Sequence, residues 1–559
     1  MLDYKTPVQD LLYTLKQGAN AERLPGWDDA LAQEVINQAA RLIDGEIAPL
    51  DQLADSHPAR LEDGDVVLSD GFVDAYENYV GGGWSGLTAP EAYGGQALPE
   101  VLGAALQEAL SGACVSFQML LSLGQGAMRA LFAHADERQR ARYLPPLVSG
   151  EWLATMCMTE SVAGSDLGLL RTTAKAAEDG SWRLQGEKIF ITGGGQNLTG
   201  NIVHLVLARV EGAAPGVRGL SLFICPKMRA DGRPNQVSVL RLEQKMGLHA
   251  SPTCQLLFDG AEAEMLGQPG EGLACMFTMM NAERLDVAAQ GVGLADVATQ
   301  RSWAYAHERR QGRAPGGQSA ADRISAHGDV QRMLLMQKAL TQGSRALLYR
   351  TSVELQLDPG SPLVALLTPV CKAFCSEAGV RAADLAIQIH GGYGYCKEFR
   401  VEQIFRDARI TTIYEGSNGI QAMTLCGRLL KMADGACIQA FQDDLLQAIE
   451  VVKRASEADM ANVLGKALSR WQQATQQVVA TKEPGPVAEA YMRLTGLTAF
   501  GAAWARLLAG AEQAPQPDVT RALANYVAQR MLPECDWLAD SVIRCDSYAL
   551  TPASVFAPG

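Results

Sequence analysis

The sequence of 559 residues has little positive charge for its size. Its 48 Lys and Arg residues stand against 62 Asp and Glu residues, which gives a net charge of -14. Nucleic acids and anionic membrane surfaces attract basic proteins, so this balance argues against both as partners. An anionic small-molecule ligand would need Arg or Lys residues placed locally at its own site.

Long apolar runs and a secretory leader are also missing. No run approaches the roughly 20 apolar residues that a membrane-spanning helix needs, so we expect no membrane insertion. The first residues, MLDYKTPVQDLLYTLKQG, contain no long apolar stretch and no small-residue cleavage site. We therefore expect that the protein has no secretory signal and that it is located in the cytoplasm.

The twelve cysteines form no CxxC pair. Cys371 and Cys375 are the closest two, four residues apart on a predicted helix, and neither a His nor another cysteine pair accompanies them. The pattern is typical of buried, reduced thiols in a cytoplasmic protein and not of a metal or disulfide framework. We therefore expect no metal site.

The hydrophobic pattern changes three times along the chain. Helical spacing dominates residues 1–150, short β-rich runs fill residues 151–268, and long helical segments return over 269–432 and again over 433–559. The sequence therefore predicts an α+β fold with an N-terminal helical domain, a middle β-barrel domain, a four-helix bundle and an extra C-terminal helical domain. In the middle region the predicted strands are 182–184, 189–192, 202–210, 220–225, 237–242 and 254–258.

Four segments carry candidate functional residues. Residues 156–166, MCMTESVAGSD, combine small and hydroxyl side chains, although, taken alone, a structural turn explains them better. Residues 190–195, FITGGG, allow close approach of a flat or phosphorylated ligand, but a plain loop is as plausible. Residues 388–395, QIHGGYGY, follow a predicted helix and so are not a dinucleotide-binding fingerprint. In residues 406–421, Glu415 stands on a Gly-flanked loop, where it is either a surface carboxylate or free to project into a cleft.

Taken together and in this order, the four segments resemble the acyl-CoA dehydrogenase family over roughly residues 30–430. Thr159-Glu160 to Ser165-Asp166 is similar to the first family signature, and Gln388 to Glu398 to the second. Leu169 and Gln403 depart from the residues usual in these two signatures, and the segments around them resemble those of an extended branch of the family. That branch has an additional C-terminal helical domain and includes 3-(methylthio)propanoyl-CoA dehydrogenases. The resemblance places the catalytic domain in residues 269–432.

The resemblance implies α,β-dehydrogenation of an acyl-CoA thioester, a step of fatty acid metabolism. A carboxylate removes the α-proton while the β-hydrogen leaves as hydride to flavin N5. The backbone N–H of the catalytic Glu and a ribityl hydroxyl of FAD stabilise the enolate-like charge. Ile413-Tyr414-Glu415-Gly416 resembles the loop with the catalytic glutamate, so Glu415 is the expected base. Glu283, directly before Arg284, stands where other family members carry the base and is a second candidate, or else it forms a helix-surface salt bridge.

The same resemblance implies an FAD site and a CoA site. The hydroxyls of Thr159 and Thr192 would hydrogen-bond the flavin ring, and Phe190 stands where many members have Trp. Ser165 and Arg284 are the expected CoA contacts, while Gln311-Gly312-Arg313 departs from the family pattern. The further residues that match FAD contacts are Met156, Met158, Arg309, Gln388, Gly391, Gly392, Ser417 and Asn418.

The resemblance also implies partners. In the family some FAD contacts come from a second subunit, so a homodimer is expected, and an electron-transferring flavoprotein or a similar acceptor reoxidises the flavin. Three alternatives stay open at this point. The same fold could act on a carrier-protein-tethered acyl group, could pass electrons to oxygen as a flavin oxidase, or could be a non-enzymatic DNA-binding homologue, which the acidic charge disfavours.

Overall fold

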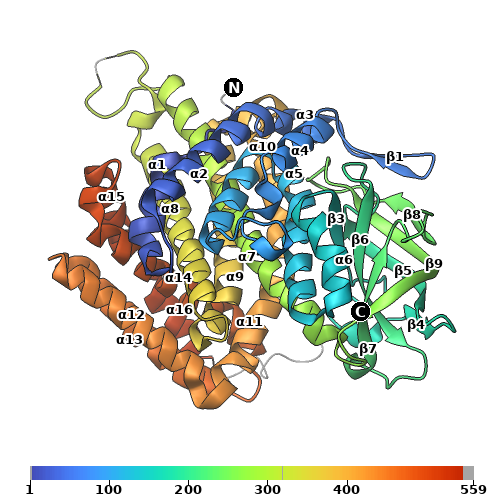
Figure 1. Cartoon of the computed structure of the whole chain (residues 1–559). Coiled ribbons are helices and arrows are strands. Elements are labelled where there is room, and N and C mark those ends of the chain that lie inside the picture. Colours follow the sequence, from blue (N-terminus) through green and yellow to red (C-terminus); the bar gives the residue numbers. More distant parts are fainter. Residues whose placement is uncertain (1–2, 318, 546–559) are drawn as a thin grey trace, which may run out of the picture. The chain divides into compact units, whose positions relative to one another are not determined.

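The computed structural model describes residues 3–317 and 319–545, which divide into two compact units (Figure 1). The first unit contains residues 3–6, 34–286 and 392–407, and the second contains residues 7–33, 287–391 and 408–545. The predicted fold class is confirmed, because helices precede a β-rich middle region and long helices follow it.

The helices of the first unit pack around one long, apolar helix. This helix, α5 (Glu100–His134), is buried almost all round, as expected for a core helix that is apolar on every face. A capping box formed by Asp136 and Gln139 opens the next helix, α6, and the Pro145–Pro146 pair lies inside its last turns instead of ending it at that point. The other helices of this unit include α3 (Leu50–Ser56), α4 (Phe72–Gly81), α6 (Glu137–Val148) and α10 (Val401–Ala408).

A small hairpin interrupts the helices of the first unit. It consists of β1 (Arg60–Glu62) and β2 (Asp65–Val67), which pair in antiparallel fashion through a two-residue turn at Asp63-Gly64. Helical spacing alone did not predict this hairpin. Asp63 and Gly64 both have positive φ, the geometry that two-residue hairpin loops require.

The middle region forms a seven-stranded sheet (Figure 1). The pairings β6–β4, β4–β5, β5–β9, β9–β7 and β7–β6 close a ring, while β3 pairs with β6 and β8 pairs with β9. Two of the predicted strands, 182–184 and 189–192, are parts of the single strand β5. The strands are β3 (Trp152–Cys157), β4 (Thr173–Ala176), β5 (Trp182–Thr192), β6 (Asn201–Val210), β7 (Leu220–Pro226), β8 (Val237–Leu242) and β9 (Thr253–Leu266).

Strand β6 is buried on both faces, and its alternate residues join two different cores. Val203, Leu205 and Leu207 pack with residues of α5, α6 and the start of α7 (Gly272–Glu308). Val206 and Ala208 point the other way, into the apolar interior enclosed by the strands. A continuous run of apolar residues is what a strand covered on both sides requires.

The second unit is built from long helices that approach each other closely. A Cβ on Gly291 of α7 would lie 2.2 Å from the Cys375 carbonyl oxygen of α9 (Pro362–His390), and one on Gly379 would lie 2.7 Å from the Gly291 carbonyl oxygen. Glycines at both positions therefore let the two backbones cross in direct contact. Helices α8 (Gly328–Leu357) and α11 (Asn418–Gly427) complete this part of the unit.

Five further helices, drawn in orange and red in Figure 1, follow in the same unit. The central one, α14, packs against α8, because a Cβ on Gly343 would lie 2.4 Å from Trp504 Nε1, and this indole N–H donates to the Ala339 carbonyl oxygen. Tyr13 of the N-terminal helix α1 (Val8–Tyr13) donates to the Leu507 carbonyl oxygen. The five helices are α12 (Ala436–Arg454), α13 (Ala458–Ala480), α14 (Gly485–Ala509), α15 (Pro517–Tyr526) and α16 (Glu534–Ile543).

Two findings bear on the expectations from composition. Within the described residues, the segment Pro362–Tyr395 has the length and hydropathy of a membrane span, and 72% of its most apolar window is buried inside the protein. Ten of the twelve cysteines are buried as predicted, but Cys396 is exposed and Cys545 is half-buried.

Candidate functional site

In the first unit, the segment after β3 runs beside β5. The Ile189 N–H donates to the Thr159 carbonyl oxygen over 2.9 Å, and Lys188 Nζ donates to the Met158 carbonyl oxygen over 3.0 Å. Met156 and Met158 pack on the apolar cluster that contains α5 and α6. The predicted residues Met156, Met158 and Thr159 are therefore brought together with the end of β5.

Phe190 is the exposed residue at this place. It lies in a register shift between β5 and β9, where the ladder runs from the pair Lys188–Leu256 to the pair Ile191–Cys254. Its φ of +60° is unusual for a residue with a side chain, and the residue is 59% exposed. An aromatic ring held outside the sheet by a strained bulge is the kind of feature that active sites retain. Thr192 follows two residues later and pairs with Thr253 of β9.

A buried ion pair lies directly behind this surface. Glu160 Oε1 accepts from Lys188 Nζ over 2.8 Å, and Lys188 is fully buried. Glu160 also accepts from the backbone N–H groups of Arg171 and Thr172 and from the Thr172 hydroxyl. Burial works against the ionised form of Glu160, but Lys188 and the Thr172 and Arg171 donors outweigh it and hold its pKa below the usual value. The Glu160 carboxylate thus holds the loop between β3 and β4 in place.

Ser165 lies on that loop and is exposed. The loop opens with reciprocal backbone hydrogen bonds between Glu160 and Ala163, and the Asp166 carboxylate accepts from the Gly168 N–H. Ser165 is therefore presented on an ordered turn. The structural turn that the sequence allowed here is present, and it keeps the hydroxyl accessible.

The second candidate base, Glu283, lies on α7 with its side chain buried. Only 2% of Glu283 and 7% of Arg284 is exposed, so neither belongs to a helix-surface salt bridge. Arg284 Nη1 donates to Asn281 Oδ1 over 2.8 Å, and its guanidinium lies 5.9 Å from the ring centre of Phe277. A Cβ on Gly126 of α5 would lie 2.5 Å from Glu283 Oε1, so the carboxylate fits against the backbone of α5.

In the second unit, Glu415 has a left-handed backbone. Its φ is +55°, a conformation that costs a residue with a Cβ about 1–2 kcal/mol. The Tyr414 hydroxyl donates to Gln290 Oε1 of α7, and Gln421 Nε2 donates to the carbonyl oxygens of Glu415 and Gly416 over 3.1 and 3.2 Å. The loop around Glu415 is thus fixed on both sides.

Ser417 and Asn418 begin α11. Ser417 is the N-cap, with its hydroxyl accepting from the Ile420 N–H. Asn418 Oδ1 accepts from Lys372 Nζ over 2.8 Å, and Asn418 Nδ2 is directed at acceptors of Ala373, Ser376 and Glu377. The Asn418 side chain is therefore bound to α9, while the residue was predicted from the sequence as an FAD contact.

The remaining predicted cofactor residues lie around the ends of α7 and α9. Arg309 follows the last residue of α7, is exposed, and contacts Gln311 Oε1 over 3.4 Å. Gln388, Gly391 and Gly392 are exposed at the C-terminal end of α9 and in the turn after it. These four residues are accessible for a ligand.

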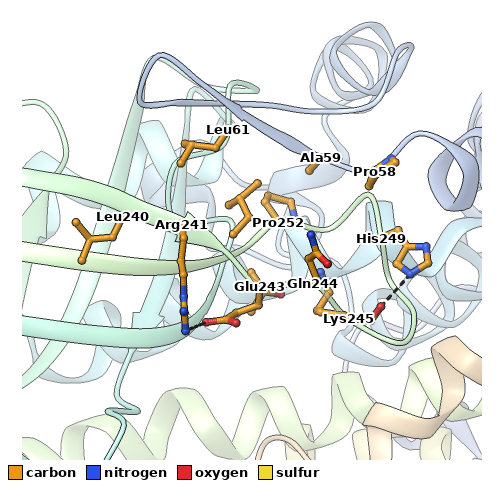
Figure 2. A pocket seen from close by; sticks show the side chains of 12 residues that line it. Pro58, Ala59, Leu61, Leu240, Arg241, Glu243, Gln244, Lys245, His249 and Pro252 are labelled. Carbon is orange, nitrogen blue, oxygen red and sulfur yellow. Dashed lines mark hydrogen bonds and ion pairs between the residues drawn. The ribbon is translucent and has the colours of Figure 1, made fainter.

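A pocket of about 530 Å³ in the first unit contains none of the predicted residues (Figure 2). Its basic side chains already have partners within the protein. Arg241 contacts Glu243, Lys245 Nζ donates to the Ser251 carbonyl oxygen, and His249 contacts Asp55. Burial lowers the pKa of Lys245 to about 8. We therefore do not place the functional site here.

Sequence reasoning missed Lys188, Lys372, Gln290 and Gln421. Each acts through a contact with a residue distant in the sequence, except Gln421, which lies six residues after Glu415. The lysine that interrupts the apolar helix around Lys372 was the available signal, because a buried Lys requires a partner.

Comparison with known families covers nearly the whole chain. The sequence matches the acyl-CoA dehydrogenase N-terminal domain over residues 32–151, the middle domain over 155–261 and the C-terminal domain over 270–430. Residues 438–551 match a domain described as acetyl-CoA dehydrogenase C-terminal like.

Three relatives illustrate the similarity. The 3-methylmercaptopropionyl-CoA dehydrogenase of Ruegeria pomeroyi is 38% identical over 96% of this chain and 97% of its own. The structure of Caenorhabditis elegans ACDH-11 in complex with C11-CoA has a TM-score of 0.80 at 22% identity, covering 98% of this chain and 96% of that one. An acyl-CoA dehydrogenase from Bacillus anthracis complexed with FAD has a TM-score of 0.64 at 23% identity, covering 93% and 96%. At such identities the two structures show a shared fold.

Proposed function

Because this chain belongs to the acyl-CoA dehydrogenase family, we propose that it oxidises an acyl-CoA to the 2-enoyl-CoA with Glu415 as the base that removes the α-proton. It is an FAD-dependent acyl-CoA dehydrogenase by family. The observation that carries the choice of base is the left-handed backbone of Glu415, which Gln421 and Tyr414 support from within the second unit. A strained residue held in place by its surroundings is typical of a catalytic position.

The residues around β5 fit a flavin. Phe190 offers an exposed ring, Thr159 and Thr192 offer hydroxyls on either side of it in the sequence, and Lys188 fixes the Met158 carbonyl. Met156 and Met158 supply apolar packing. Bound FAD would accept the β-hydrogen of the substrate as hydride. The protein's own part is to hold the ring against this surface and to keep the hydroxyls oriented.

The chain's residues would divide the remaining work. The Glu415 carboxylate takes the α-proton, and its backbone N–H is a donor for the thioester oxygen, where charge develops. Ser165 and Arg284 would contact the CoA part of the substrate. Glu283 is the competing base, but its carboxylate lies against the backbone of α5 at Gly126, which supports a structural role for it.

The exposed residues of the α7 and α9 ends suggest a homodimer. Arg309, Gln388, Gly391 and Gly392 are accessible, and we propose that they complete the FAD site of a second copy. Light scattering of the yellow holoenzyme should give twice the chain mass. We further propose an electron-transferring flavoprotein as the acceptor and a cytoplasmic location.

The substrate proposal rests on the relative that aligns over almost the full length. We propose 3-methylmercaptopropionyl-CoA or a short straight-chain acyl-CoA of similar size. Anaerobic bleaching of the flavin by a panel of acyl-CoA thioesters tests this directly. A protein that stays oxidised with every thioester, or that purifies without flavin, would contradict the proposal.

The base is tested with Glu415→Gln and Glu283→Gln in the same assay. Glu415→Gln should slow flavin reduction by roughly 100- to 10,000-fold, because the amide cannot take the proton. Glu283→Gln should retain most of the rate. The opposite pattern would move the base to α7. Peroxide formation in air would indicate an oxidase. Flavin reduction by a carrier-protein thioester but by no acyl-CoA would indicate that the substrate is an acyl group bound to a carrier protein.

A further inference from the structure

The loop that carries Glu415 is held in the second unit by hydrogen bonds of two side chains, Gln421 and Asn418, to which we assign no step of the reaction. A residue with a Cβ does not stay at a φ of +55° unless the residues around it hold it there. Gly416, with a φ of +84°, lies so close to Gln421 that a Cβ there would be 2.4 Å from Gln421 Nε2. Gln421 therefore supports Glu415 only because residue 416 is glycine.

Asn418 attaches the start of α11 to α9, and both polar atoms of its side chain take part. Oδ1 accepts from Lys372 Nζ over 2.8 Å. Nδ2 lies 3.1 Å from Glu377 Oε1, 3.2 Å from Ser376 Oγ and 3.3 Å from the Ala373 carbonyl oxygen. All four partners belong to two turns of α9, so the first residue of α11 is locked to that helix.

The place where Asn418 binds is shielded from solvent. Lys372 is fully buried, and burial raises the pKa of Glu377 above its usual value. Helix α14 of the additional domain packs on this part of α9, because a Cβ on Gly496 would lie 2.8 Å from the Phe374 ring. Hydrogen bonds in such a setting are stronger than at the surface, and their geometry is well defined.

We propose that Asn418 and Gln421 are positioning residues for Glu415. Asn418 fixes the start of α11 to α9, and Gln421 fixes the carbonyl groups of Glu415 and Gly416. Together these contacts determine the direction of the Glu415 carboxylate. This role rests on the proposed function, and it differs from the FAD contact that the sequence predicted for Asn418. A carboxylate displaced by about 1 Å from its working position can lose roughly 100-fold in rate.

The proposal is tested with Asn418→Ala and Gln421→Ala in the FAD-loaded protein. Both should keep the wild-type flavin content, flavin spectrum and acyl-CoA dissociation constant, while the rate of anaerobic flavin reduction falls roughly 10- to 100-fold. Thr424→Ala is the matched control, because its hydroxyl donates only to the Ile420 carbonyl of the same helix. It should behave as wild type.

Two further variants separate positioning from simple stability. In a Glu415→Gln background, Asn418→Ala should cause no additional loss of rate, since its effect acts through the missing carboxylate. Asn418→Asp combined with Glu377→Gln reverses the direction of one hydrogen bond while keeping the Lys372 contact. This double variant should recover part of the rate that Asn418→Asp alone loses.

The outcomes distinguish the possible roles. Loss of FAD from Asn418→Ala with a normal rate in the remaining holoenzyme would overturn the proposal and make Asn418 a cofactor contact. A normal rate per flavin together with a lower melting temperature would overturn it in favour of a purely structural role. If wild-type flavin is not reduced by any acyl-CoA, the proposed function itself fails, and the positioning role fails with it.

Discussion

Lys188 Nζ lies 2.8 Å from Glu160 Oε1 in the interior of the first unit, and the same ammonium donates to the Met158 carbonyl oxygen. Lys188 is fully buried and Glu160 is 6% exposed. Removing one member of such a pair leaves the other charge buried without its counter-ion, which is far more costly than removing both.

We therefore predict that Lys188→Met destabilises the protein by about 3–5 kcal/mol, measured as the free energy of unfolding in urea. The double variant Glu160→Gln, Lys188→Met should recover a large part of this loss. Because the folded-state pKa of Glu160 is lowered, its stabilising contribution is complete above its ordinary pKa and is lost as the pH falls through the lower value. Equal losses in the single and double variants would contradict the pairing.

The fold was largely predictable from the sequence because most helices and strands have a hydrophobic pattern that can be recognised within the segment itself. The helical spacing within residues 1–150 and the apolar runs of β6 and β7 correspond to elements found in the structure. The β1–β2 hairpin was missed because its strands have only three residues each, too few to show a period. The single strand β5 was divided in two because the non-apolar run Gln185-Gly186-Glu187-Lys188 interrupts its apolar pattern, and its register against β9 shifts between Leu184 and Gln185.

The candidate site was predictable only in part, for a physical reason. Glu415 and Phe190 were identified from a resemblance, but nothing in the sequence predicted that both have positive φ. The contacts that hold such backbones are made by residues such as Gln290 and Lys372, which are 124 and 46 positions from their partners. Pairings across such distances are a property of the folded chain and leave no periodic trace in the sequence.

His204 should make stability depend on pH. It is fully buried in β6, with Nδ1 bonded to the Thr155 hydroxyl, and burial lowers its pKa to about 3. Between about pH 6.5 and 3 the unfolded chain therefore binds a proton at this residue that the folded chain does not, so the free energy of unfolding falls as the pH falls. The loss is about 1.4 kcal/mol per pH unit within this window.

Urea unfolding at pH 6.5 and pH 5 measures this effect. Wild type should lose about 2 kcal/mol more than His204→Gln over this interval, from the one extra proton. His57→Gln is the control, because His57 is exposed. A wild-type pH dependence that persists in His204→Gln would assign the proton to another group.

Gly126 gives a way to disturb Glu283 without replacing it. Ala at this position would place a Cβ 2.5 Å from Glu283 Oε1 and 2.9 Å from Met279 Cγ, so the carboxylate must move. We predict that Gly126→Ala lowers stability by about 1–3 kcal/mol but retains most of the rate of flavin reduction, since Glu415 is the proposed base. Gly124→Ala is the control, with its nearest neighbour atom at 3.9 Å. A large loss of rate in Gly126→Ala alone would support Glu283 instead.

Asp444 should be the most sensitive polar residue in the attachment of the additional helical domain. Its Oδ1 accepts from Arg350 of α8 over 3.1 Å and from Arg506 of α14 over 2.6 Å, and all three side chains are buried. Burial opposes ionisation of Asp444, but the two guanidinium groups outweigh it and hold its pKa below the usual value. The carboxylate is thus charged and joins three helices of the second unit.

Asp444→Ala would leave two buried guanidinium groups facing each other, and we predict a loss of about 3–5 kcal/mol in the free energy of unfolding. Asp444→Asn should lose less, because the amide oxygen still accepts one hydrogen bond. The exposed i,i+4 pair Glu450–Arg454 on the same helix is the reference, where Glu450→Ala should change stability by less than about 1 kcal/mol. A loss of that small size in Asp444→Ala would mean that apolar contacts such as Gly343–Trp504 hold α14 on α8 without help from the ion pairs.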